Sequence, residues 1–192
     1  MAARAPSISL HVKVVAYEPC ARHAPAPCDC PDKVVSKLPD GSPAVYEHDT
    51  DLGTTVLLGL LSANLLDTGQ NVLDTTGTSR SVSANSAVSS PTIVAGTGST
   101  AAAVSDTNLQ SQSSGSSGSQ AIASVVVSGA TITISATITN GSAGTIAYDE
   151  VGIVVTVGGH TFLLAHDAPL TGGPFNVSVG GTLAVTYTGT VS

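Results

Sequence analysis

The sequence predicts a mainly β protein, an antiparallel β-sandwich or jelly roll with one short helix and an extended N-terminal arm. Val, Ile and Thr dominate the second half, and these β-branched residues favour strands. Apolar and polar residues alternate there, with glycine turns roughly every 8–12 residues. The surface is also unusual, because Ser81–Ser192 contains no Lys or Arg. Such a surface suits a chain whose neighbours are other protein subunits.

Residues 1–47 are predicted to form the arm. Ser7 to Val15 has the alternation of a half-buried strand, and six prolines then follow between Pro19 and Pro43. Prolines at this density exclude a helix and disfavour central strands. The region has too little apolar mass for its own core. We therefore expect the arm to pair with a neighbouring subunit while residues 48–192 fold alone.

Residues 48–69 are predicted to form the helix and a connection. Leu52, Val56 and Leu60 lie at i, i+4 and i+8, which places them on one helical face. Thr50 or Asp51 can cap the start of this helix. A buried strand over residues 54–58 is the alternative interpretation.

Residues 70–192 are predicted to form the sandwich domain. Asn140-Gly141 predicts a tight turn, and residues 111–120 predict a flexible connection. The predicted strands are Ser90–Ala95, Thr131–Thr139, Val151–Val157, Thr161–Ala165, Phe175–Val179 and Thr182–Thr188.

Four candidate metal ligands lie within the Pro-rich arm. Cys20, His23, Cys28 and Cys30 could bind one structural zinc ion, because thiolates and imidazole form its preferred tetrahedral set. A metal would also order a region that lacks a core. Three reduced thiols, or one disulfide with an odd thiol, are the alternatives.

Charge and hydropathy argue against nucleic acid and the membrane as partners. The net charge is −7, and Arg80 is the only cation after residue 47, so direct nucleic-acid binding is not expected. The longest apolar stretch, Val56 to Leu66, has about half the length of a membrane span. No signal peptide is recognisable, and we expect synthesis in the cytoplasm.

No residue set predicts catalysis. His166-Asp167 and Asp149-Glu150 could be acid–base pairs, but adjacent strand residues point to opposite faces. Gly96-Thr97-Gly98 lacks the lysine of a phosphate loop. We expect scaffold roles instead: Glu150 needs a partner at the sheet rim, and the Tyr187 hydroxyl can reach the backbone of a neighbour.

Two stretches of the chain carry short segments in a characteristic order. The first runs from Ile93 to Thr100 and continues over Ser105–Leu109. The second combines the segments Ile138–Ser142, Glu150–Ile153, Leu163–Asp167 and Val179–Thr188. In this order they resemble segments of small virion proteins of tailed bacteriophages. The resemblance covers about residues 50–192, and it departs at His166, where the family segment has Arg.

This resemblance implies a β-sandwich component of the virion without catalytic residues, made in the host cytoplasm. Its partners would be copies of itself and other virion proteins, on the capsid, neck or tail. Two alternatives remain open: a receptor- or carbohydrate-binding module of a fibre, and a subunit of a cellular surface filament. Scarce aromatic residues disfavour a sugar-binding site.

Overall fold

The structure is a computed structural model that describes residues 8–18, 35–38, 41–50, 69–83, 86–112 and 118–191. Within these ranges the chain contains no helix, and all named strands pair antiparallel. The prediction of a mainly β, antiparallel protein is therefore confirmed. The same ranges hold no helix long and apolar enough to cross a membrane.

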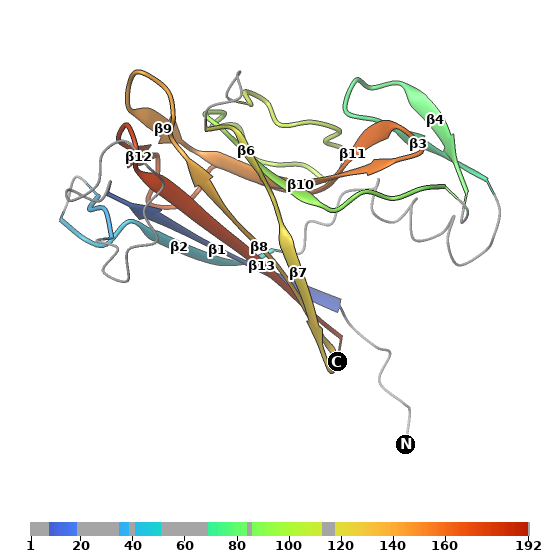
Figure 1. Cartoon of the computed structure of the whole chain (residues 1–192), viewed down its shortest axis with the longest axis horizontal. Helices are drawn as coiled ribbons and strands as arrows, with labels where there is room; N and C mark the ends of the chain where they lie inside the picture. Colours follow the sequence, from blue (N-terminus) through green and yellow to red (C-terminus); the bar gives the residue numbers. More distant parts are fainter. Residues whose placement is uncertain are drawn as a thin grey trace.

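The larger of the two main sheets has five strands in the order β2-β1-β13-β8-β7 (Figure 1). Its longest ladder joins β1 to β13 and runs without a break from Ile8↔Val191 to Tyr17↔Thr182. The alternating segment predicted over Thr131–Thr139 is β8 with the same bounds. The strands are β1 Ile8–Tyr17, β2 Val45–Thr50, β7 Ser124–Ser128, β8 Thr131–Thr139 and β13 Thr182–Val191.

The second main sheet has four strands in the order β11-β10-β5-β6. The apolar run predicted as a strand over Val151–Val157 lies in β10, which is buried along nearly its whole length. These strands are β5 Thr92–Gly96, β6 Gln120–Ile122, β10 Glu150–Val157 and β11 His160–Asp167. Two short pairs complete the described strands: β3 Gln70–Leu73 with β4 Ser79–Val82, and β9 Ile146–Tyr148 with β12 Phe175–Val177.

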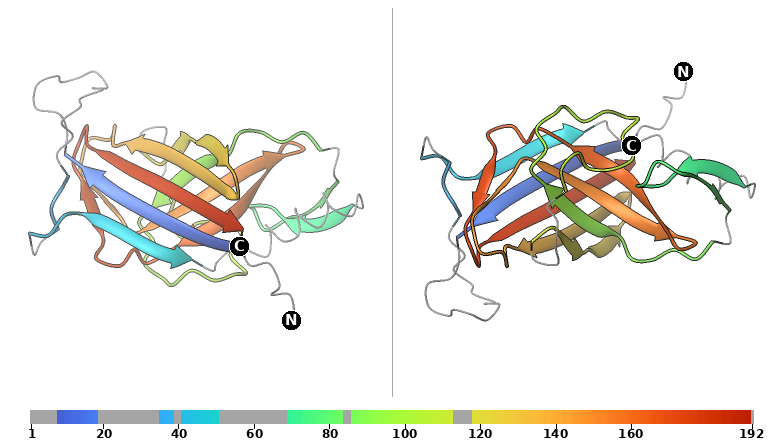
Figure 2. Two further views of the ribbon diagram at one scale, coloured as in Figure 1. Left: turned by 90° about the horizontal axis from the view of Figure 1, so that it is seen from below. Right: turned by 90° about the horizontal axis from the view of Figure 1, so that it is seen from above.

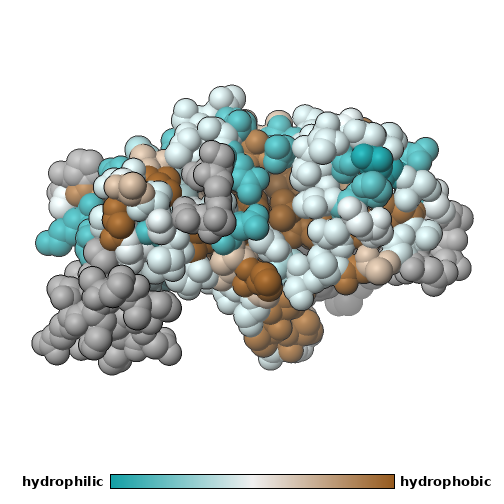
Figure 3. Space-filling view, turned by 45° about the horizontal axis from the view of Figure 1, so that its top comes forward, coloured by the Kyte–Doolittle hydropathy of each residue, from teal (hydrophilic) through white to brown (hydrophobic). Residues whose placement is uncertain are grey.

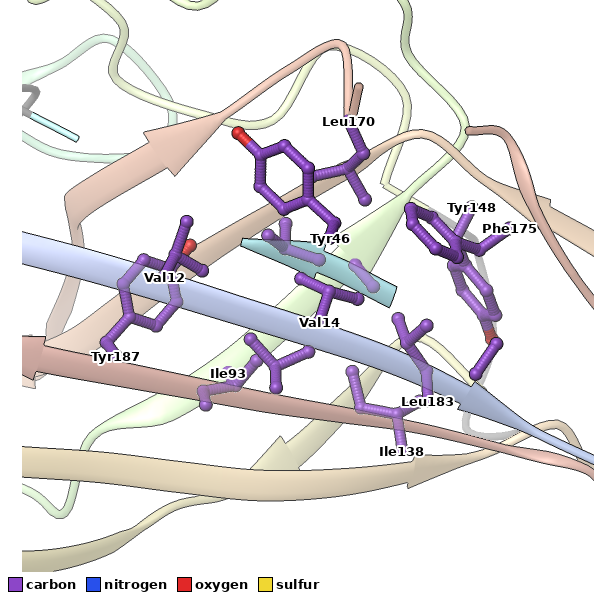
Figure 4. Close-up of a cluster of buried hydrophobic side chains, with 14 of the residues drawn as sticks. Val12, Val14, Tyr46, Ile93, Ile138, Tyr148, Leu170, Phe175, Leu183 and Tyr187 are labelled. Carbon is purple, nitrogen blue, oxygen red and sulfur yellow. The ribbon is translucent and has the colours of Figure 1, made fainter. Parts of the chain in front are cut away.

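The two main sheets lie over one another, and the principal core fills the space between them (Figure 2). Val14 from β1 and Leu183 from β13 meet Ile93 from β5 in this core (Figure 4). These three side chains are fully buried. The alternation of β13 therefore serves the core as expected, with Leu183, Val185 and Tyr187 inside and the residues between them partly exposed. In β1, Val12 and Val14 face the core in the same way, but Val15 is buried too.

The position of β1 corrects the prediction of an arm that docks on a neighbouring subunit. β1 lies in the interior of the sheet and pairs with β2 on one side and β13 on the other, within the same chain. Val12, Val14 and Ala16 belong to the principal core. The prediction was wrong because the partner strand lies at the far end of the sequence, where local patterns cannot identify it.

Two sequence predictions fall outside the described residues. The helix predicted within residues 48–69 falls almost entirely on residues 51–68, and the zinc loop falls on residues 19–34. Cys20, His23, Cys28 and Cys30 all lie in the latter range, so the zinc site stays a prediction.

Asn140 does not form the predicted tight turn of a hairpin. Its side chain is fully buried and donates hydrogen bonds to the carbonyls of Gly144 and Val177, at 2.8 and 2.7 Å. Its Oδ1 accepts hydrogen bonds from the backbone N–H and the hydroxyl of Ser142. The asparagine thus organises a wider loop after β8, and the next strand, β9, pairs with β12 instead of β8.

Candidate functional site

Three ionisable side chains that are far apart in the sequence meet beside the second main sheet. Glu150 begins β10, His166 lies near the end of β11, and Asp106 belongs to the connection between β5 and β6. The His166 Nδ1 atom lies 2.8 Å from Asp106 Oδ2, and its Nε2 lies 3.1 Å from Glu150 Oε2. The imidazole therefore lies between two carboxylates.

Glu150 is fully buried, yet its carboxylate is well supplied with donors. Oε1 accepts the backbone N–H of Gly98 at 3.0 Å and that of Ser111 at 2.7 Å. Oε2 accepts the N–H of Gln110 at 2.9 Å in addition to its contact with His166. A buried carboxylate needs such a set of partners. The expectation that Glu150 has a partner at the sheet rim is confirmed.

The bonds to Glu150 hold the segment of residues 97–112 against β10 and β11; we call this segment the clamped loop. The loop is also tied internally. Asp106 Oδ2 accepts the N–H of Ala103 at 2.8 Å, and the Gln110 amide exchanges two hydrogen bonds with the backbone of Thr100. Among the described residues, the three backbone N–H groups that donate to the Glu150 carboxylate all come from this loop, so one carboxylate organises both of its ends.

Glycines make room for this arrangement. A Cβ atom at Gly98 would lie 2.7 Å from Glu150 Oε1, and one at Gly152 would lie 2.8 Å from both Leu109 Cδ1 and the Ala165 carbonyl oxygen. Real Cβ atoms do not approach so closely. Gly96-Thr97-Gly98, which lacks the features of a phosphate loop, therefore has a structural use: its backbone lies directly against the carboxylate.

Hydrogen bonds outweigh the effect of burial on the pKa values of Glu150 and His166. Burial alone would raise the pKa of Glu150, but the bonds from His166 and from the N–H groups of Gln110, Ser111 and Gly98 leave it lowered. Burial alone would lower the pKa of His166, but the bonds with Glu150 and Asp106 leave it raised. Both shifts favour a protonated His166 imidazole beside an ionised Glu150 carboxylate.

The cluster is built to hold the loop in place. Each ring nitrogen of His166 faces its own carboxylate, and the side chain is 1% exposed, so neither nitrogen is open to an external group. The three side chains also do not converge on a single point. Among the described residues, no group of three or more His, Cys, Asp or Glu side chains is arranged to hold a metal ion.

His166 and Asp167 point in opposite directions, as the alternation of the strand predicts. Asp167 is directed into the protein, where its Oδ2 accepts the Tyr187 hydroxyl at 3.0 Å. Burial, together with Asp167, raises the pKa of Tyr187 well above its usual value. The expectation that Tyr187 reaches the backbone of a neighbour is wrong, because the ring is fully buried and its hydroxyl bonds within the chain.

The strand pattern places Glu150 and His166 near strand ends as polar groups, but it does not connect them with Asp106. Asp106 lies 60 positions before His166 and belongs to no regular strand. Its one signal is its place in the Ser105–Leu109 segment of the resemblance. Asp149 stays separate from the cluster, since its Oδ1 accepts the N–H of Leu170 at 3.2 Å.

The cluster predicts a window of maximal stability. Because the pKa of His166 is raised in the folded protein, its contribution to stability is fully present below its usual pKa of 6.5. This contribution is lost as the pH rises through the folded-state pKa. Because the pKa of Glu150 is lowered in the folded protein, its contribution to stability is fully present above its usual pKa of 4.5 and is lost on acidification. Both contributions are therefore nearly complete at about pH 5–6.

We expect the His166→Asn variant to have a free energy of unfolding about 2 kcal/mol lower than that of the wild type near pH 5.5. The difference should shrink as the pH rises toward 9, because the wild type then loses its imidazolium. Urea denaturation at a series of pH values measures it. A difference that stays constant from pH 5.5 to 9 would show that the charge of His166 does not hold the loop.

Comparison of the chain with models of known protein families, with curated proteins and with solved structures finds no match.

Proposed function

We propose that this protein is a non-enzymatic structural component of a bacteriophage particle, present in multiple copies on the capsid, neck or tail. In this proposal the two stacked sheets form a β-sandwich, and the protein acts in the virion after synthesis in the host cytoplasm. Its partners are other copies of itself and other virion proteins. No step of its action requires a cofactor, although a structural zinc at Cys20, His23, Cys28 and Cys30 remains part of the proposal.

One observation carries the proposal. The segments that resemble virion proteins supply the three members of one cluster: Asp106 from Ser105–Leu109, Glu150 from Glu150–Ile153, and His166 from Leu163–Asp167. Residues that a shared fold would need to keep together thus touch in space. This supports the view that the resemblance reflects a common architecture.

The cluster also accounts for the departure from the family segment. Arg stands in that segment where this chain has His166. Arg and protonated His are both cations with more than one N–H donor, so either can bridge two carboxylates. The position therefore keeps its chemistry although the residue differs.

The aromatic residues argue against the carbohydrate-binding alternative. Sugar-binding sites commonly offer exposed aromatic rings for stacking. Here Tyr46, Tyr148, Phe162, Phe175 and Tyr187 are all buried, which leaves only the partly exposed Tyr17. Their rings serve the core, and Figure 4 shows four of them there.

Quantitative mass spectrometry of purified particles from the natural source tests the proposal. We expect the protein in the particle fraction at a fixed ratio to the major shell protein, and in several copies per particle. Its presence only in the soluble fraction of infected cells would contradict the proposal. Particles treated with a mild denaturant should release it as an intact folded chain, since the described residues build the principal core from strands of a single chain.

A further inference from the structure

The edge strand β7 exposes an unusual amount of apolar surface. Its three consecutive valines, Val125, Val126 and Val127, are 44%, 57% and 70% exposed. Successive strand residues point to opposite faces of a sheet, so exposure of three in a row places both faces of β7 outside the core. Figure 3 shows an apolar protrusion at the lower border of the molecule, where this part of the sheet lies.

The hairpin of β7 and β8 carries this surface beyond the second sheet, as Figure 1 shows. The alternation of β8 predicts that its isoleucines all face the core. Ile138 does so, but Ile132, beside the turn, is 39% exposed. Ile132 pairs with Val127 across the hairpin, so the two strands present one apolar surface. The end of the hairpin near its turn therefore extends beyond the core.

One edge of β7 also lacks a neighbouring strand among the described residues. β7 is the last strand of its sheet and pairs with β8 on the other side. Ser128 and Thr131 close a two-residue turn, in which Gly129 has a φ of 58°. The residue pair that flanks such a turn is hydrogen-bonded, and non-hydrogen-bonded and hydrogen-bonded pairs then alternate along the ladder. Val125 and Val127 therefore belong to non-hydrogen-bonded pairs with β8. The N–H and C=O groups of Val125 and Val127 therefore point outward, away from β8.

Nothing in the hairpin protects this edge. Natural edge strands are usually blunted by charged residues, prolines or bulges. Residues 107–148 contain no Asp, Glu, Lys, Arg or Pro, and the β7–β8 register is unbroken. Two identical surfaces that meet bring like charges together, so an uncharged surface is the kind that tolerates its own copy.

The sequence of β7 suits pairing with a second copy of the same strand. Ser124-Val125-Val126-Val127-Ser128 reads the same in both directions. Two antiparallel copies centred on Val126 therefore place serine opposite serine and valine opposite valine at every position. The outward groups of Val125 then face those of Val127 in the second copy, in hydrogen-bonded pairs. Val126 faces itself across a non-hydrogen-bonded pair, where side chains come closest.

We propose that β7 pairs antiparallel with β7 of a second copy of this chain, about a two-fold axis at Val126. The inference rests on the proposed function, because it names the surface through which copies meet. The pairing would join two five-stranded sheets into one continuous sheet across the dimer. Each copy has one β7, so the contact is isologous and closes at two chains.

The expected dimer is reversible. A five-residue strand pair with its valines buries less than the roughly 1,200 Å² typical of a stable complex. Sedimentation velocity of the full-length purified protein, over about a hundredfold range of concentration, should therefore show a monomer–dimer equilibrium. Val126→Lys places two ammonium groups against each other on the axis and should raise the dissociation constant by more than about tenfold.

Ile122→Lys is the matched control. It makes the same chemical change at an exposed apolar residue of β6, outside the proposed pair, and should leave the equilibrium near that of the wild type. Val126→Glu alone should also be monomeric. An equimolar mixture of Val126→Lys and Val126→Glu should dimerise again, because the introduced charges then face each other across the axis.

Three results would overturn the proposal. They are a wild type that stays monomeric at every concentration, a dimer that Val126→Lys leaves intact, and open-ended aggregation in place of a dimer. A monomer whose Val126→Lys variant also melts well below the wild type would show that another segment of the same chain covers β7. None of these results bears on particle composition, so the proposed function could still be established by mass spectrometry of particles.

Discussion

Val14→Asp should unfold the protein. Val14 is fully buried in the principal core, where β1 contributes it opposite Val185 of β13 and Tyr46 of β2. An aspartate there would have a carboxylate without a partner in apolar surroundings, at a cost of more than about 4 kcal/mol. That is a large fraction of the stability of an ordinary domain. Circular dichroism and thermal unfolding of the purified variant measure the effect.

Lys13→Gln is the control for this substitution. Lys13 is the preceding residue of the same strand, faces outward, and is half exposed in an ion pair with Glu47. Its loss should change the free energy of unfolding by less than about 0.5 kcal/mol. A folded Val14→Asp monomer that melts like the wild type would show that β1 is supplied to a neighbour, as the sequence suggested.

Glu150→Gln should be the most damaging change in the buried cluster. An amide offers one acceptor oxygen where the carboxylate offers two, and its NH₂ group would face an N–H donor of the clamped loop or the ring of His166. We expect a loss of about 3 kcal/mol or more in the free energy of unfolding. Amide hydrogen exchange should accelerate at Gly98, Gln110 and Ser111.

Glu47→Gln makes the same chemical change at an exposed carboxylate. It should leave both the free energy of unfolding and the exchange at Gly98, Gln110 and Ser111 nearly unchanged. Equal effects of the two substitutions, or fast exchange at these amides in the wild type, would show that Glu150 does not hold the clamped loop.

Strand periodicity predicts much of this fold because it is a local property. The alternation over Thr131–Thr139 defines β8, and the apolar run over Val151–Val157 defines most of β10. What periodicity cannot give is the partner of each strand. The local pattern predicts that β1 pairs with another subunit because its own region offers no second strand of similar quality, whereas its partner β13 lies at the opposite end of the described chain.

The cluster shows the same limit for side chains. A carboxylate at the start of a buried strand must have partners, and this much followed from the residue types. The identity of those partners depends on a loop without regular structure, whose course no pattern reveals. The exposure of Ile132 in β8 has a related reason: alternation states which side chains share a face but not how far the opposing sheet extends.

The pairing of β1 with β13 has a consequence for the order of events at the ribosome. β1 is the first of the described strands to be synthesised and β13 is the last, yet they are adjacent in the finished sheet. The apolar face of β1 must therefore wait for almost the whole chain before its main partner emerges. Contacts between such distant segments form slowly and leave unpaired strands exposed to aggregation. Premature arrest of translation should accordingly yield chains that depend on chaperones, whereas a chain that has reached β13 can close its core.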